Sequence, residues 1–130
     1  NVYGKGQNYQ YAGVISKFLK NISENKPLII YGDGNQSRDF VSVYDVIRAI
    51  ECAISSDNSG TYKIASGKSI SVNELAEMMI LSSGKKLDIT HKEQKKGDIR
   101  NSATDVSLAE KNLGFTAKRI LADELPKIWF

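Results

Sequence analysis

Two glycine-containing loops each carry an arginine, and these residues could do chemistry together. The first loop spans residues 31–40 and contains Arg38, and the second spans residues 95–100 and contains Arg100. A guanidinium group is planar and can donate two parallel hydrogen bonds to a phosphate or a carboxylate. The two loops could therefore converge on one diphosphate.

Acidic residues lie close to both arginines in the sequence, and this allows a simpler interpretation. Arg38 would pair with Asp39 or Asp33. Arg100 would pair with Asp98. Exposed ion pairs of this kind contribute little to stability. Spacing alone favours these surface ion pairs over a phosphate site.

The other reactive side chains form no catalytic pattern. The sequence contains no Gly-x-Gly-x-x-Gly, Walker-type, Gly-x-Ser-x-Gly or His-Glu-x-x-His motif. The single histidine, His91, and the single cysteine, Cys52, have no partner at a catalytic or zinc-binding spacing. We therefore expect no catalytic residue and no metal site in this chain.

Composition indicates one folded domain. The chain has 130 residues, of which 41% are hydrophobic and 25% are charged, values that exclude disordered and fibrous classes. Its net charge of +3 comes from dispersed lysines and arginines. Neither nucleic acid nor a membrane surface is therefore an expected partner.

The expected compartment is the cytoplasm. A lone cysteine cannot form an internal disulfide, and the apolar runs are too short to cross a bilayer. The first residue is Asn1 rather than methionine, and the opening reads as a strand end, so we expect the chain to be part of something longer.

Hydrophobic periodicity predicts a mixed α/β fold in one unit. Helical spacing of apolar residues, with a capping box from Ser71 to Glu74, distinguishes the helices from short β-branched strands. The predicted helices span 12–24, 45–55, 72–83, 105–114 and the tail 121–130, and the predicted strands span 28–31, 39–43, 61–65 and 87–91.

Several motifs in a fixed order resemble those of a known family. They are Asn1-Val2-Tyr3-Gly4, Gly13-Val14-Ile15, residues 28–34, Arg38-Asp39-Phe40-Val41, Asn73-Glu74-Leu75-Ala76, Gly97-Asp98-Ile99-Arg100 and Leu113-Gly114-Phe115. Together they resemble extended short-chain dehydrogenase/reductases, in particular NAD-dependent nucleotide-sugar epimerases and dehydratases of the UDP-glucose 4-epimerase type. The resemblance covers essentially the whole chain.

The resemblance is to the carboxyl-terminal part of these enzymes. It implies that residues 1–130 form the small substrate-binding domain, together with elements that normally complete a Rossmann sheet. The half with the NAD-binding loop and the catalytic Tyr-x-x-x-Lys is absent from this sequence. NAD would thus belong to the parent enzyme, and this chain alone would bind no cofactor and be inactive.

The resemblance implies three residues that contact the diphosphate. Asn1 would donate a hydrogen bond to it, and Arg38 and Arg100 would neutralise it from two sides. The neighbouring residues Asp39 and Asp98 would orient the arginines rather than act as catalysts.

Five further residues would contact the rest of the nucleotide-sugar. Gly13 and Val14 would approach it closely at the amino terminus of the first helix, where backbone amides favour an anion. Phe18 would line the base pocket. Ile29 and Tyr31 would flank the nucleobase and ribose, largely through backbone groups.

Three departures from the family pattern bear on sugar specificity rather than on the fold. Lys5-Gly6 replaces the usual Pro-Arg, the loop over residues 7–12 is short, and Pro126 lies where the family's last helix has no proline. Because proline is tolerated only in a first helical turn, we expect this helix to start late.

The expected function is binding of the nucleoside diphosphate of a UDP-sugar, within an enzyme that epimerises a UDP-hexose at C4. A dTDP-glucose 4,6-dehydratase or another sugar-nucleotide dehydratase is one alternative, and a free-standing, non-catalytic module that binds sugar nucleotides or proteins is another. The expected partners are the UDP-sugar and the NAD-binding half. Apolar surfaces that lack that half would favour homo-oligomers.

Overall fold

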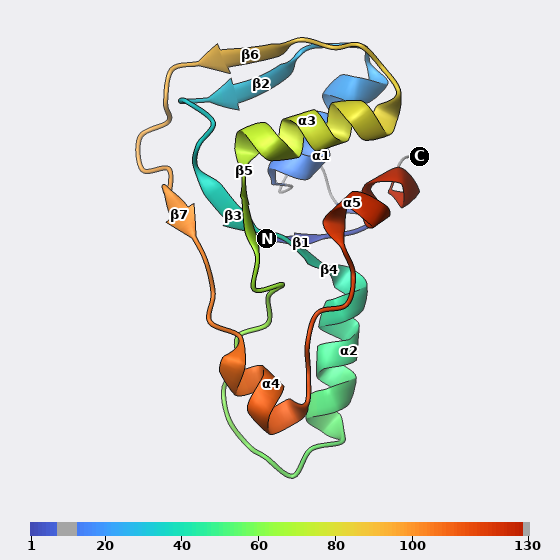
Figure 1. Cartoon of the computed structure of the whole chain (residues 1–130), viewed down its shortest axis with the longest axis vertical. Coiled ribbons are helices and arrows are strands. Elements are labelled where there is room, and N and C mark those ends of the chain that lie inside the picture. The colour runs from blue at the N-terminus through green and yellow to red at the C-terminus, as the bar shows by residue number, and fades with distance from the viewer. Residues whose placement is uncertain (8–12, 129–130) are drawn as a thin grey trace.

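The computed structural model describes residues 1–7 and 13–128. Helices are interspersed with short strands along this part of the chain (Figure 1). The strands are β1 (Val2–Tyr3), β2 (Leu28–Tyr31), β3 (Ser37–Asp39), β4 (Val41–Ser42), β5 (Ser69–Ser71), β6 (Ile89–Lys92) and β7 (Asn101–Ser102). The helices are α1 (Val14–Ser23), α2 (Val43–Ile54), α3 (Val72–Ser83), α4 (Ser107–Leu113) and α5 (Leu121–Glu124), and a 3₁₀ turn, η1, spans Leu125–Lys127.

The larger hydrophobic core lies between helices α1 and α3 and the parallel pair β2–β6, at the top of Figure 1. Phe18 and Ile22 of α1 pack with Leu28 of β2 and with Leu75 and Met79 of α3, all at most 1% exposed. Apolar residues at helical spacing on both helices produce these buried faces. The core fixes where α1 begins and where β2 ends.

A three-stranded sheet connects this core to the rest of the molecule. Its central strand, β3, pairs antiparallel with β5 and parallel with β7. A separate parallel pair joins β1 to β4, with Val2 opposite Val41 and Tyr3 opposite Ser42. Strand β3 therefore brings residues near 38, 70 and 102 side by side.

A second, smaller core packs α2 against α4 at the lower end of Figure 1. Its buried residues are Ala49 of α2, Ala109 of α4 and Phe115, which follows α4. The carboxylate of Asp45, at the start of α2, is 1% exposed and accepts hydrogen bonds from the backbone amides of Lys118 and Arg119. This carboxylate ties the carboxyl-terminal segment to α2.

The helices predicted from periodicity are present, with shifted ends. Helix α3 has the predicted capping box, in which Ser71 accepts from the Glu74 amide and Glu74 accepts from the Ser71 amide. The prediction over 12–24 corresponds to α1, although residue 12 lies outside the described residues. The predicted tail helix divides into α5 and η1, with Pro126 in the first turn of η1, and residues 129–130 also lie outside the described residues.

The strand predictions required more correction. Residues 61–65 form no strand, although the sequence is β-prone, because no other strand pairs with this segment among the described residues. The predicted strand 39–43 divides into β3 and β4, and α2 already begins at Val43. Strands β5 and β7 were not predicted. They are two or three residues long and are defined by pairing with β3, which local sequence does not reveal.

No helix within residues 1–7 and 13–128 is long and apolar enough to cross a membrane.

Candidate nucleotide-binding site

A cavity of about 400 Å³ lies where α1 begins, β2 ends and the segment between β6 and β7 passes by. Seven of the eight residues that the resemblance assigned to the substrate line it: Asn1, Gly13, Val14, Phe18, Ile29, Tyr31 and Arg38. They come from four separate parts of the chain, and the fold brings them together. The eighth residue, Arg100, is not among the lining residues.

The side chains that line the cavity divide into apolar and cationic groups. Phe18, Ile29 and Val72 contribute the apolar surface. Four basic side chains also line the cavity: Lys17, Arg38, Lys95 and Lys96. A cavity with this division suits an anionic ligand that also carries a flat, weakly polar group.

The amino terminus of α1 opens onto the same cavity. Gly13 is the N-cap residue, and within residues 1–7 and 13–128 no side chain caps this end of the helix. The first turn contains no acidic residue. Its backbone amides can therefore donate hydrogen bonds to an anion, which the positive end of the helix dipole also attracts.

Arg38 is held at the cavity by three acceptors. Its Nη1 atom donates to the carbonyl oxygens of Ser37 at 2.8 Å and Ile99 at 2.6 Å, and its Nη2 atom donates to Asp98 Oδ1 at 2.7 Å. The side chain is 15% exposed. Because a guanidinium has five N–H groups, two remain for a ligand.

Arg100 instead forms a two-pronged ion pair with Asp33. Its Nη1 and Nη2 atoms lie 2.6 Å and 2.8 Å from the two carboxylate oxygens. Hydrogen bonding from Arg100 is the main reason that the pKa of Asp33 lies well below its usual range, and the Asn35 amide contributes as well. The geometry places Arg100 beside the cavity rather than in it.

The ion pairs expected from sequence spacing are exchanged in the structure. Arg38 pairs with Asp98 rather than with Asp39 or Asp33, and Arg100 pairs with Asp33 rather than with Asp98. The reason is that strand β3 lies beside β7, which brings the two loops together. Each arginine then pairs with a carboxylate on the other loop.

Asp39 was expected to orient Arg38, but its carboxylate binds a different part of the chain. Its carboxylate accepts from the amides of Ser66 and Gly67 and from the Ser66 hydroxyl, at 2.6–2.9 Å. It therefore holds the turn before β5 and does not orient Arg38. The Asn1 side-chain amide donates to the Asp39 carbonyl at 3.3 Å, which fixes Asn1 at the cavity.

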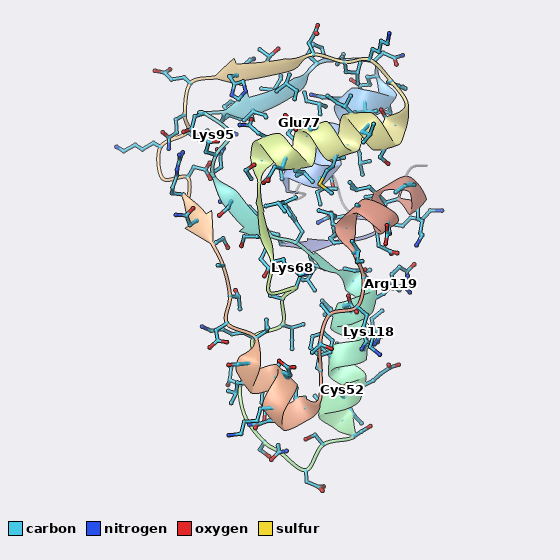
Figure 2. All side chains as sticks on the ribbon, in the orientation of Figure 1. Cys52, Lys68, Glu77, Lys95, Lys118 and Arg119 are labelled. Atoms are coloured by element: carbon cyan, nitrogen blue, oxygen red, sulfur yellow. The ribbon has the colours of Figure 1, made fainter. Side chains whose placement is uncertain are left out.

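Three lysines that line the cavity were not predicted as site residues from the sequence. Lys95 lies on the loop between β6 and β7 (Figure 2). Its Nζ atom is 3.9 Å from the centre of the Tyr31 ring. Lys96 follows it, and Lys17 is in the first turn of α1. The lysine-rich sequence before Gly97 was a usable signal for the first two.

The lining residues supply cationic and hydrogen-bonding groups. Neither His91 nor Cys52 lines the cavity. The one lining carboxylate, Asp98, is engaged by Arg38. No group of three or more potential metal ligands occurs among the described residues. The arrangement can bind and orient an anion.

Comparisons with known proteins identify the family to which this chain is similar. Residues 1–65 match the sequence profile of the family described as NAD dependent epimerase/dehydratase. A dTDP-L-rhamnose 4-epimerase from Burkholderia thailandensis is 33% identical over 88% of this chain and 33% of its own length. A UDP-glucuronate 4-epimerase from Thermodesulfobacterium geofontis is 32% identical over 78% of this chain and 32% of its own length.

Solved structures of similar fold cover nearly the whole chain. A UDP-glucose 4-epimerase from Thermotoga maritima, solved with UDP-glucose, superposes with a TM-score of 0.93 at 32% identity, over 98% of this chain and 42% of that one. A UDP-glucuronic acid 4-epimerase from Bacillus cereus, solved with UDP-glucuronic acid and NAD, superposes with a TM-score of 0.89 at 27% identity, over 98% and 41%. This chain therefore spans between a third and about two fifths of the length of these proteins.

Proposed function

Since this chain belongs to the NAD-dependent epimerase/dehydratase family, we propose that it is the nucleotide-sugar-binding part of such an enzyme and that its cavity holds the nucleoside diphosphate of a UDP-sugar. The parent reaction would be epimerisation of a UDP-hexose at C4. The observation that carries the proposal is that seven residues assigned to the nucleotide-sugar by resemblance, Arg38 among them, line one cavity together with three lysines.

NAD supplies hydride chemistry to this family, but the residues present here do not fit it. The chain has no glycine-rich dinucleotide fingerprint. Among the described residues that line the cavity, the acidic side chain is Asp98, which Arg38 already binds and which is therefore not free to bind a ribose. We therefore assign NAD to a part of the enzyme outside this chain, which would precede these 130 residues. The proposed work of this chain is binding and orientation.

The diphosphate would lie at the start of α1. The first-turn amides after Gly13, the two remaining N–H groups of Arg38, and the ammonium groups of Lys17 and Lys95 can all donate to its oxygens. Hydrogen bonds that carry a full charge are roughly twice as strong as neutral ones. The diphosphate would supply most of the attraction.

The nucleobase would lie against the apolar side chains of Phe18, Ile29 and Val72. With the nucleotide fixed at both ends, the sugar is held in one orientation relative to the catalytic groups of the parent enzyme. Binding energy from the non-reacting nucleotide then positions the reacting carbon.

The proposal is tested by calorimetric titration of the chain with UDP-glucose, UDP, dTDP and NAD. We expect the UDP ligands to bind and NAD not to bind. Stronger binding of dTDP than of UDP would assign the site to the dTDP-sugar alternative. If NAD binds and UDP ligands do not, the proposal is wrong.

A lysine pair provides the matched control. Lys95→Ala should weaken UDP binding by about tenfold, because it removes one charge-assisted contact. Lys111→Ala removes the same charge from the exposed surface of α4 and should bind UDP like the unmodified chain. Equal affinities of the two variants would contradict the placement of the diphosphate.

A further inference from the structure

The ion pair between Arg100 and Asp33 lies just outside the cavity and joins two loops that line it. Both side chains are about half exposed, at 52% and 50%. The pair is two-pronged, a geometry that fixes orientation as well as distance. Asp33 follows β2, and Arg100 precedes β7.

Asp33 lies in a loop that is hydrogen-bonded to α3. The side-chain amide of Asn73, in the first turn of α3, donates to the Asp33 carbonyl at 2.9 Å, and the Asn73 backbone amide donates to the Gly34 carbonyl at 3.0 Å. Gly34 has a φ of +76°, and a Cβ atom there would overlap the Asn73 side chain. A loop so closely fitted to α3 can serve as an anchor.

Arg100 lies at the end of a segment that contains cavity-lining residues. Residues 95–98 all line the cavity, and they continue directly into Ile99 and Arg100. Only a turn bond from the Asp98 amide to the Lys95 carbonyl, at 3.2 Å, is formed within this segment. Its placement therefore depends on contacts with the facing loop.

Lys95 at one end of the segment lies over the Tyr31 ring, and the hydrogen bonds to the facing loop are at the other end, near Arg100. Arg38 binds Asp98 and the Ile99 carbonyl, and the Ser37 amide donates to the Arg100 carbonyl at 2.9 Å. The Arg100 side chain adds the one link from this segment to the Asp33 carboxylate. Together these bonds fix where Lys95 meets the cavity.

We propose that Arg100 is a positioning residue, which holds the segment 95–98 over the cavity through Asp33 and so sets the affinity for a nucleoside diphosphate without touching it. The inference rests on the proposed function of the cavity. It replaces the direct contact with the diphosphate that the family resemblance implied for Arg100.

The two roles predict opposite effects of one substitution. Asp33→Asn removes the ion pair but keeps an oxygen that can accept from the Asn35 amide. If Arg100 touched the ligand, this variant would free its guanidinium and remove a nearby negative charge, and UDP would bind more tightly. If Arg100 positions the segment, UDP binds more weakly, by roughly two- to fivefold for an exposed pair.

The experiment is a double-mutant cycle with UDP titrations on Asp33→Asn, Arg100→Gln and the double variant. We expect each single variant to bind more weakly, and the double variant to bind no more weakly than either, because the two side chains act as a unit. Arg100→Lys, which keeps the charge but not the planar fork, should also be weaker. Tighter binding by Asp33→Asn, or additive losses, would overturn the inference.

A measurement without ligand separates this inference from the proposed function. Amide hydrogen exchange at Asp98 should be faster in Asp33→Asn and Arg100→Gln than in the unmodified chain, with exchange in the core of α3 unchanged. Unchanged exchange at Asp98 would overturn the positioning role. If the unmodified chain does not bind UDP, the proposed function fails, and the claim about affinity fails with it.

Discussion

The arginines illustrate what each residue can do once its partners are known. Arg38 and Arg100 have the same chemistry and similar loop sequences around them. Arg38 lines the cavity, and two of its five N–H groups are not used in the three hydrogen bonds described above. Arg100 donates two parallel hydrogen bonds to the Asp33 carboxylate. The difference arises from the loops that face them, not from the residues beside them in the sequence.

The ion pair between Asp33 and Arg100 predicts that the free energy of unfolding depends on pH. The pKa of Asp33 lies below its usual value because Arg100 donates to the carboxylate. A folded-state pKa below the unfolded value means that the pair's contribution to the free energy of unfolding is complete above the ordinary aspartate pKa of about 4 and is lost as the pH falls further. Carboxyl NMR titration should show the low pKa.

The Arg100→Gln variant is the control for that titration. The pKa of Asp33 should move up toward its usual range in this variant, and the acid side of the stability curve should become less steep. The Ser107 amide lowers the pKa of Asp105, and that pKa should not change between the two proteins. An unchanged pKa of Asp33 would show that Arg100 does not bind it in solution.

Among the elements, α1 and α3 determine the site most directly. Helix α1 presents its uncapped amino terminus to the cavity, while α3 carries Val72 in the wall and Asn73 under the Asp33 loop. The start of α3 is fixed by the capping box. Helix ends therefore matter more to this site than helix lengths.

Loss of the α3 cap should be measurable. Ser71→Ala removes the hydroxyl that accepts from the Glu74 amide and should lower the free energy of unfolding by about 1 kcal/mol. Ser59→Ala, at an exposed loop position, should change stability little. Urea unfolding of the two variants checks this. Equal midpoints would mean that the cap does not contribute.

The sequence was sufficient for helices α1 to α4, apart from their exact ends, and insufficient for the divided tail helix and for the strand pairs. Periodicity and the Ser71 cap are local signals, so α3 was predicted over the residues where it occurs. Strand β5, in contrast, is defined by pairing with β3, more than 30 residues earlier. Residues 61–65 have strand-forming side chains but no partner strand here. Pairing is a property of the fold, not of a segment.

The candidate site shows the same division. The seven predicted cavity residues came from the family resemblance, which carries information about tertiary placement. Spacing alone predicted neither that Arg38 would pair with Asp98 nor that Lys17 would reach the cavity. Side-chain partners across two loops cannot be read from either loop by itself.

For the molecule as a whole, the exposed face of α2 is the main unexplained apolar surface. Tyr44, Ile47, Ile50 and Ile54 are between 48% and 80% exposed and recur at helical spacing. Contiguous apolar surface of this kind favours association. We expect the isolated chain to form dimers or larger oligomers through α2.

Sedimentation velocity tests that expectation. Replacing Ile50 and Ile54 with glutamate should shift the chain toward monomer, whereas Leu81→Glu, at an exposed apolar position on α3, should not. If the unmodified chain is a clean monomer at high concentration, α2 is not a self-association surface.

The central claim is that the cavity at the start of α1 binds a nucleoside diphosphate, and an NMR titration of the isotope-labelled chain with UDP tests it most directly. We expect saturable chemical-shift changes at the amides of Gly13, Val14, Tyr31 and Gly97 and no change at the amides of α2 and α4. Shifts confined to α2 and α4, or no shifts at all in a folded sample, would contradict it.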